Sequence, residues 1–353
     1  VEPGHGIVTD EDRYEISRAA LSETLERILL LDEPGHASFV TRFQPTSGPG
    51  MAKGVEDTTF YRYNRLVALN EVGGNPAAWA LAVDEFHRAN IKRAERFPRH
   101  LLTTFTHDTK RSPDVRARLV ALTWHAEEWE EFARAELDFE DRNEAYLALQ
   151  TLVAACPIEE ERIDAYLEKA YRESKARTNW LEPDEEWEGR IKEWARSKRE
   201  VAGAFAERLR EDAERIALGM LVLKLTSPGV PDIYQGDELE ALSLVDPDNR
   251  RPVDWDERRR LLDSLRGGAE PTRHTLKLWV TWKLLDLRRR RIDAFAGGYM
   301  PLDAPPDVCA FMRGAEVAVF VPLRGDAEPS LDGEWRDVLE GRLPFSVLER
   351  AAG

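Results

Sequence analysis

The chain has 353 residues, of which 42% are hydrophobic and 33% are charged, a composition typical of a soluble globular protein with one large domain or two. The formal net charge of −16 argues against nucleic acid or an anionic membrane as a partner, because phosphate groups are bound by clustered Lys and Arg. The tract "RRRR" at 288–291 is the main exception, and we interpret it as a solvated helix end.

Two cysteines, Cys156 and Cys309, lie far apart in the sequence and lack the spacing of metal ligands. We therefore expect reduced thiols in a cytoplasmic protein. No apolar run has the length of a membrane span, and the first residues do not resemble a signal peptide. The chain opens with valine instead of methionine, which suggests a piece of a longer polypeptide.

The first half of the chain is predicted to be mostly helical, with two strands. Helices are expected at about 11–31, at 51–72 with an end at the Gly73-Gly74 pair, and at 84–98. Strands are expected at 39–44 ("FVTRFQ") and 101–106 ("LLTTFT"), and a turn-rich loop at 45–50.

From Pro113 to about Leu225 nearly every segment has a helical pattern. The first of these helices has Ser112 as N-cap, Pro113 at its first position and Asp114 in its first turn. The segment "IALGMLVLKL" is apolar on all sides and should be buried. A short strand is predicted in "VPDIYQG", then helices to about Arg291, and then a β-hairpin in 308–323 that turns at Arg313-Gly314.

These elements predict an α/β fold with few strands and a β-rich C-terminal part. Only three strand candidates precede that part, whereas a complete (β/α)8 barrel needs eight. The chain can therefore supply at most part of such a barrel, interrupted by large helical insertions. The segments we distinguish are 1–38, 39–112, 113–215, 216–291 and 292–353.

Polar side chains follow each strand candidate, where the catalytic residues of barrel enzymes lie. Carboxylates among hydrogen-bond donors and aromatic rings suit a sugar, which presents hydroxyl groups and apolar C–H faces. The residues that we select are Lys53, Glu56, Tyr61, His107, Asp108, Lys110, Arg111, Tyr234, Asp248, Asn249 and Arg250. Each of these short patterns, taken alone, is also typical of an ordinary loop, turn or helix cap.

Other chemistries lack their sequence patterns. There is no G-x-S-x-G motif, neither cysteine has a histidine nearby in the sequence, and the seven histidines show no metal-binding spacing. The glycine pairs do not form a phosphate-binding loop. We therefore expect no cofactor and no metal.

Four segments together resemble the maltooligosyl trehalose synthases of the α-amylase superfamily, whose fold is a (β/α)8 barrel. They are "MAKGVEDTTFYRYNRLVALNEVGGNP", "THDTKRSPDVRARL", "SPGVPDIYQGDEL" and "SLVDPDNRRPVDW". The third is typical of the whole superfamily near its last barrel strand, whereas the others are more particular. The resemblance extends from about Phe39 to Leu302.

The resemblance implies roles for individual residues. Asp108 matches the third catalytic carboxylate, which follows barrel strand seven, and His107 matches the adjacent histidine that binds the same sugar. Lys53 and Arg111 resemble cationic residues that line the pocket, and Glu56 falls in a binding loop. The implied substrate is a maltooligosaccharide, whose reducing-end α-1,4 linkage is converted to an α,α-1,1 linkage by intramolecular transglycosylation.

The nucleophilic Asp and the acid/base Glu of the superfamily have no counterpart that we can identify in this sequence. We therefore expect a C-terminal segment that lacks the first part of the barrel, has an incomplete closing β-domain, and is inactive alone. Two alternatives remain open. The chain is another glucan hydrolase or transferase of the superfamily, or it is a non-catalytic glucan-binding remnant. The oligomeric state is not predicted.

Overall fold

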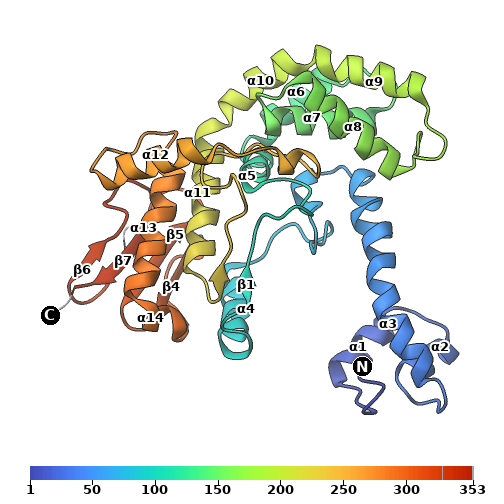
Figure 1. Ribbon diagram of the computed structural model, residues 1–353, viewed down its shortest axis with the longest axis horizontal. Helices are drawn as coiled ribbons and strands as arrows, with labels where there is room; N and C mark the ends of the chain where they lie inside the picture. The colour runs from blue at the N-terminus through green and yellow to red at the C-terminus, as the bar shows by residue number, and fades with distance from the viewer. Residues whose placement is uncertain (328, 352–353) are drawn as a thin grey trace. The chain divides into compact units, whose positions relative to one another are not determined.

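The structure is a computed structural model, and it describes residues 1–327 and 329–351. The chain forms two compact units, Val1–Phe60 and Tyr61–Gly353. Each unit is described separately below, and Figure 1 labels their elements. The five segments that we distinguished in the sequence divide the chain more finely than these units, and they stay a prediction.

The first unit is helical, with three α-helices and a single π-helical turn. Its elements are α1 (Asp10–Arg18), α2 (Glu23–Leu29), α3 (Ala37–Met51) and η1 (Ala52–Glu56), and a 3₁₀ turn, η2 (Thr59–Tyr61), crosses into the second unit. Thr9 caps α1, because its hydroxyl accepts the Asp12 N–H while the Asp12 carboxylate accepts the Thr9 N–H. The single helix predicted for 11–31 is thus two helices, separated where Ala20 takes a left-handed conformation with φ of 48°.

The strand predicted at 39–44 is wrong, because these residues lie inside α3. Phe39 and Phe43 stack at 5.6 Å between ring centroids, which is the i, i+4 contact of a helix. The six-residue window suggested a strand because it is rich in aromatic and β-branched residues. The turn-rich loop predicted at 45–50 is also helical, since α3 continues through Pro45 and Pro49.

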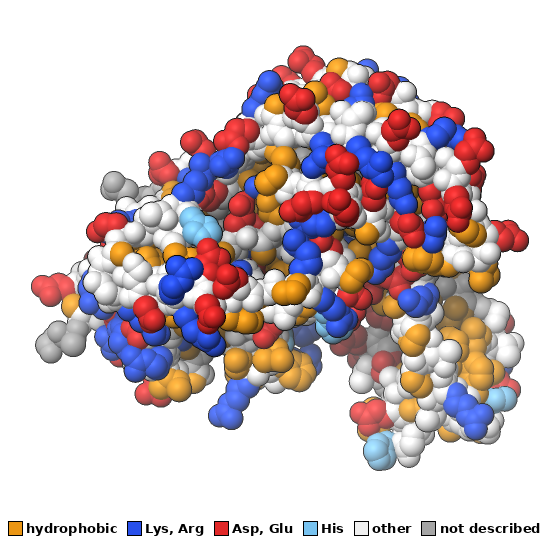
Figure 2. All heavy atoms as spheres, turned by 45° about the horizontal axis from the view of Figure 1, so that its top comes forward, with side chains coloured by type: hydrophobic (Ala, Val, Ile, Leu, Met, Phe, Trp, Pro, Cys, Tyr) orange, Lys and Arg blue, Asp and Glu red, His pale blue; other side chains and the backbone are white. Residues whose placement is uncertain are grey.

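The second unit is rich in helices and contains two small sheets. Its α-helices are α4 (Val83–Arg96), α5 (Pro113–Ala121), α6 (Ala126–Glu136), α7 (Arg142–Ala155), α8 (Glu160–Ser174), α9 (Glu185–Ser197), α10 (Arg199–Arg208), α11 (Arg210–Thr226), α12 (Trp255–Arg266), α13 (Leu276–Arg290) and α14 (Ile292–Ala296). Acidic and basic side chains are mixed over the helical surface in Figure 2, as the charge pattern predicted. Among the described residues, no helix is both long and apolar enough to cross a membrane.

The helices α5, α7 and α11 lie at the centre of the second unit. The predicted cap of α5 is confirmed, because the Ser112 side chain accepts the Val115 N–H and Pro113 opens the helix. Nearly all of α7 is buried. The apolar end of α11 is buried as predicted, and its Gly219 faces Phe345 of the C-terminal part so closely that an added Cβ would lie 3.3 Å from the ring. These helices form one continuous support for the loops described below.

Two of the predicted strands form a short parallel sheet. β1 (Leu101–Leu102) pairs with β2 (Val230–Pro231), with Leu101 opposite Val230. Both are far shorter than the sequence suggested. Gly229, with φ of 122°, leads into β2, and an added Cβ there would lie 2.9 Å from the His100 carbonyl oxygen. Only glycine permits this approach of the two strands.

The helix predicted for 51–72 is largely wrong. These residues form irregular chain with the short turns η1, η2 and η3 (Val67–Leu69). The Val67 N–H donates to the Gln150 side-chain oxygen at 3.0 Å, and the Arg111 guanidinium donates to the Val67 carbonyl at 3.1 Å. Because distant side chains take these backbone groups, the segment does not need helical hydrogen bonds.

The C-terminal part contains an antiparallel sheet of five strands in the order β3-β4-β5-β7-β6. The strands are β3 (Tyr299–Pro301), β4 (Val308–Arg313), β5 (Val317–Pro322), β6 (Trp335–Asp337) and β7 (Ser346–Arg350). The predicted hairpin is confirmed, since Arg313 pairs with Val317 around a turn that begins at Gly314.

The arginine tract at the end of α13 is more buried than predicted. Arg288 donates to the carbonyl oxygens of Leu225 at 2.9 Å and Gly229 at 2.5 Å. Arg290 and Arg291 contact the Glu349 carboxylate, and only the side chain of Arg289 is mostly exposed. The tract therefore joins α13 to β2 and β7 instead of forming a solvated helix end.

Candidate functional site

The loops that follow β1 and β2, residues 103–112 and 232–250, lie side by side. Arg111 forms an isolated antiparallel bridge with Leu244, and the Ser112 N–H donates to the Ser243 carbonyl at 2.9 Å. Ser243 returns a hydrogen bond from its N–H to the Ser112 hydroxyl at 3.2 Å. The two predicted groups of polar residues are therefore brought together in space, although more than a hundred residues separate them in the sequence.

Asn249 fixes the tip of the first loop from the second one. Its side-chain amide donates to the carbonyl oxygens of His107 at 3.0 Å and Thr106 at 3.3 Å. The side chain of Asn249 is only 4% exposed, so it acts behind the loop instead of on its surface. Its assignment as a substrate-binding residue stays a prediction, and in the structure its side chain holds the His107 backbone in place.

His107 and Asp108 are both exposed in the first loop. The Nε2 atom of His107 lies 3.3 Å from a carboxylate oxygen of Asp108, and the two side chains are 51% and 74% exposed. The turn forms because the Thr106 hydroxyl accepts the Asp108 N–H at 3.1 Å, while the Thr109 hydroxyl donates to the Thr106 carbonyl at 2.8 Å. Both polar side chains are therefore exposed on a loop whose turn is held by hydrogen bonds.

The two cations of the motif, Lys110 and Arg111, are buried instead. The exposed fractions are 5% for Lys110 and 1% for Arg111. Besides the Val67 carbonyl, the Arg111 guanidinium contacts the Asn70 carbonyl at 3.4 Å and the Tyr166 hydroxyl at 3.0 Å. Arg111 therefore has a structural role that the sequence did not predict.

Tyr61 is buried beside Lys110. Its ring lies 5.8 Å from the Lys110 ammonium group, and its side chain is 1% exposed. The assignment of Tyr61, Lys110 and Arg111 as substrate-binding residues stays a prediction, and all three residues are buried in this structure.

The second loop contributes one aromatic ring and a set of structural ion pairs. Tyr234 is half-buried and packs edge-on against Phe105 at 4.7 Å between ring centroids. Asp248 receives both Arg162 hydrogen bonds, at 2.7 and 2.9 Å, and also accepts the Leu244 N–H. Although burial raises the pKa of the Asp248 carboxyl, these donors outweigh burial and hold the pKa below its usual value.

Arg250 lies on the exposed side of the second loop. It pairs with Asp246 at 2.6 Å. Asp248 thus anchors the loop, whereas Arg250 and Tyr234 remain partly accessible. Their assignment as substrate-binding residues stays a prediction.

Lys53 and Glu56 belong to the first unit, in the π-helical turn η1. The Lys53 ammonium group lies 2.6 Å from the Asp57 carboxylate, and the Lys53 side chain is 75% exposed. The assignment of Lys53 and Glu56 as substrate-binding residues stays a prediction, because they belong to the first unit and the two loops belong to the second.

Glu71 is the most informative residue that the sequence did not reveal. Its buried carboxylate accepts the backbone N–H groups of Lys110 at 2.7 Å, Arg111 at 3.1 Å and Val72 at 2.8 Å. A carboxylate two residues before a Gly-Gly pair was the only local signal, and nothing in the sequence linked it to a loop some forty residues away. Glu71 holds the base of the candidate site.

A buried ionic cluster holds the second loop against α5 and α13. The Lys277 ammonium group lies 2.7 Å from a carboxylate oxygen of each of Asp114 and Asp237, and Asp114 also accepts the Ala241 N–H. Although burial lowers it, the two carboxylates raise the pKa of Lys277 above its usual value. Lys277 is therefore charged and ties α13 to α5 and to the loop after β2.

Comparison with known proteins relates this arrangement to one family. No protein-family model matches the chain. The putative maltooligosyl trehalose synthase of Mycobacterium tuberculosis (strain H37Rv) is 38% identical over 331 residues, which is 85% of this chain and 42% of that protein.

Two solved structures that resemble this chain carry the same family name as this relative. Maltooligosyltrehalose synthase from Arthrobacter ramosus has a TM-score of 0.86 and 34% identity, over 99% of this chain and 51% of that one. The hypothetical maltooligosyl trehalose synthase of Sulfolobus tokodaii has a TM-score of 0.83 and 30% identity, over 97% of this chain and 51% of that one. The chain spans about half the length of the relatives it matches. Sequence and structure therefore relate this chain to the maltooligosyl trehalose synthases, the family that its four sequence segments resemble.

Proposed function

We propose that the chain is part of a glucan isomerase that forms maltooligosyl trehalose, a (1→4)-α-D-glucan 1-α-D-glucosylmutase. The observation that carries the proposal is the exposed His107–Asp108 pair, held on a fixed loop at the end of β1. The substrate is a maltooligosaccharide, whose reducing-end glucose is released, retained and rejoined through its anomeric hydroxyl. Such a role in trehalose biosynthesis fits a cytoplasmic enzyme without a cofactor.

The two short strands support a barrel of which this chain supplies a part. β1 and β2 are parallel neighbours, and the helices α5 to α11 form the crossover that such neighbours require. Both loops of the candidate site leave the C-terminal ends of these strands, where barrel enzymes carry their catalytic groups. We propose that β1 and β2 are strands seven and eight of a (β/α)8 barrel, with 113–215 as a helical insertion.

Asp108 acts on the sugar in the reactive subsite. Its exposed carboxylate accepts hydrogen bonds from the sugar hydroxyls and stabilises positive charge as it develops on the ring. His107 binds the same sugar, and its contact with Asp108 orients both groups. A retaining mechanism also needs a nucleophilic carboxylate and an acid/base carboxyl about 5–5.5 Å apart. Neither of these two is assigned to a residue of this chain, which we expect to bind glucan without converting it.

Binding is tested on the chain itself. We expect isothermal titration calorimetry to detect maltopentaose binding, and Asp108→Ala to weaken it about tenfold, because a charged hydrogen-bond acceptor contributes about 1.5–3 kcal/mol. Asp263→Ala on α12 is the matched control, since Asp263 is also an exposed carboxylate. Equal affinity of the two variants would contradict the role of Asp108.

The reaction is tested in the natural gene product with one assay that separates all three interpretations. Formation of an α,α-1,1 linkage removes reducing ends from maltopentaose, whereas a hydrolase of the same superfamily creates them. A transferase that exchanges α-1,4 linkages leaves their number unchanged but redistributes the chain lengths, whereas a non-catalytic glucan-binding protein changes neither. We expect a decline, together with the anomeric proton signal of an α,α-1,1 linkage. A rise in reducing ends would replace the proposal with hydrolysis.

A further inference from the structure

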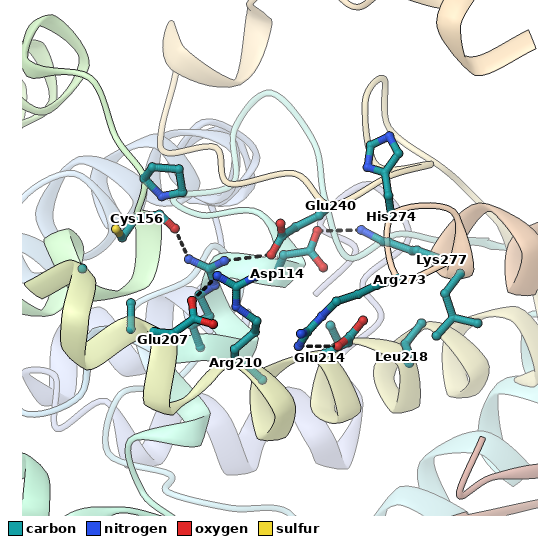
Figure 3. A pocket seen from close by; sticks show the side chains of 17 residues that line it. Asp114, Cys156, Glu207, Arg210, Glu214, Leu218, Glu240, Arg273, His274 and Lys277 are labelled. Carbon is teal, nitrogen blue, oxygen red and sulfur yellow. Dashed lines mark hydrogen bonds and ion pairs between the residues drawn. The ribbon is translucent and has the colours of Figure 1, made fainter. Parts of the chain in front are cut away.

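A cavity lies between α10, α11 and the segment that leads into α13, and Glu240 of the second loop forms part of its wall. Its volume is about 520 Å³, within the range of about 300–1,000 Å³ that is typical of small-molecule sites. Figure 3 shows side chains from these elements converging on it. Neither His107 nor Asp108 lines this cavity.

Paired charges line the cavity. Four cation–carboxylate pairs contribute to its wall, and the pairs are Arg118–Glu240, Arg210–Glu207, Arg273–Glu214 and Lys277–Asp114. The N···O distances are 2.8 Å for Arg273–Glu214 and 2.7 Å for Lys277–Asp114. A charged ligand would have to separate one of these pairs and leave a partly buried charge without its partner. The wall therefore disfavours ions.

A neutral hydroxyl group does not meet this obstacle. It donates to a carboxylate while it accepts from a guanidinium, so both members of a pair gain a hydrogen bond and neither loses the other. The wall also has an apolar strip along α11, formed by Ala213, Ala217 and Leu218, each less than 10% exposed. Such a strip suits the C–H face of a sugar ring.

We propose that this cavity is a second binding site, for a neutral ring polyol such as a hexose or a disaccharide. The site shares Glu240 of the second loop with the candidate active site, but the proposal does not depend on the function proposed above. Its occupant contacts α11, which also supports the C-terminal sheet.

The chain carries its own reporter for this site. Cys156 lines the cavity and is partly exposed, whereas Cys309 lies in β4 and is only 3% exposed. Burial raises the pKa of both thiols, that of Cys309 to about 12. Alkylation by iodoacetamide at mildly alkaline pH, followed by mass spectrometry of the two peptides, therefore reports on the cavity through Cys156 and on global opening through Cys309.

The probes are α,α-trehalose, glucose and inorganic phosphate. At a sugar concentration about ten times the dissociation constant, we expect the alkylation rate of Cys156 to fall about tenfold, because only free protein reacts. Cys309 should react only slowly, through global opening, at a rate that the sugars leave unchanged. Slower alkylation of both cysteines would show general stabilisation and overturn the proposal, as would protection by phosphate alone, or no protection by either sugar.

Variants locate the protection within the cavity. Glu214→Ala removes the carboxylate that pairs with Arg273 and should raise the half-protecting sugar concentration about tenfold, the effect of about 1.4 kcal/mol. Glu211→Ala, an exposed position on the same helix, should leave it unchanged. Protection that persists unchanged in Glu214→Ala would contradict the site, and so would its loss in Asp108→Ala. If Glu214→Ala does not fold, the comparison of sugars with phosphate on the unaltered chain decides.

Discussion

The carboxylate of Glu71 offers the sharpest test of how the candidate site is held. It accepts the N–H groups of Lys110, Arg111 and Val72, and its residue is 8% exposed. Glu71→Ala leaves the two loop N–H groups buried without an acceptor, each at a cost of about 1–3 kcal/mol. Even after some relaxation of the loop, we expect the free energy of unfolding to fall by about 3–4 kcal/mol. Glu71→Gln keeps one acceptor oxygen and should lose about half as much.

Two measurements check this reasoning, one global and one local. Urea unfolding gives the change in free energy, with Glu131→Ala on the exposed face of α6 as a control that should change it by less than about 0.5 kcal/mol. Amide hydrogen exchange at Lys110 and Arg111 reports on the loop itself and should accelerate strongly in Glu71→Ala. Unchanged exchange at these two amides would refute the assignment, even if the protein were less stable.

Two further predictions concern the second loop and the C-terminal sheet. Asn249→Ala removes the donor to the His107 carbonyl, and we expect about 2 kcal/mol of lost stability and weaker maltopentaose binding by calorimetry. Asn249→Asp, which cannot donate, should be no better than Ala, and recovery of binding by Asp would contradict this account. Three arginines outweigh burial and lower the pKa of Glu349 to about 2. Glu349→Gln should therefore cost about 2 kcal/mol at neutral pH, and thermal melts should show this difference vanish as pH falls from about 4.5 to about 2, because the stabilisation exists only while the carboxylate is charged. A difference that stays constant across this range would exclude the ionic explanation.

The parts of the fold that the sequence predicted well depend on neighbouring residues. The start of α5 follows from Ser112 and Pro113, and the hairpin of β4 and β5 follows from two apolar runs on either side of Gly314. Each of these signals acts within about ten residues. Neighbouring residues were therefore enough to predict where an element lies in the sequence, but not how it packs in the fold.

The errors arose where distant side chains decide the backbone. Residues 61–72 have a helical pattern, yet Gln150 and Arg111 take the hydrogen bonds of Val67 and prevent a helix. The strand predicted at 39–44 failed for a different reason, since a short run of aromatic and β-branched residues fits both structures. Strand propensity alone could not distinguish them.

The site shows the same division within a single motif. In "HDTKR" the sequence placed an imidazole, a carboxylate and two cations together, and we assigned all four to the sugar site. The structure separates them, because His107 and Asp108 face outward while Lys110 and Arg111 are buried on the Glu71 side. A loop that exposes two polar side chains must still pair its buried backbone N–H groups with acceptors. The N–H groups of Lys110 and Arg111 are paired with Glu71 in this way. Lys110 and Arg111 therefore support the loop, and substitutions of these residues should lower the stability of the protein before they change its activity.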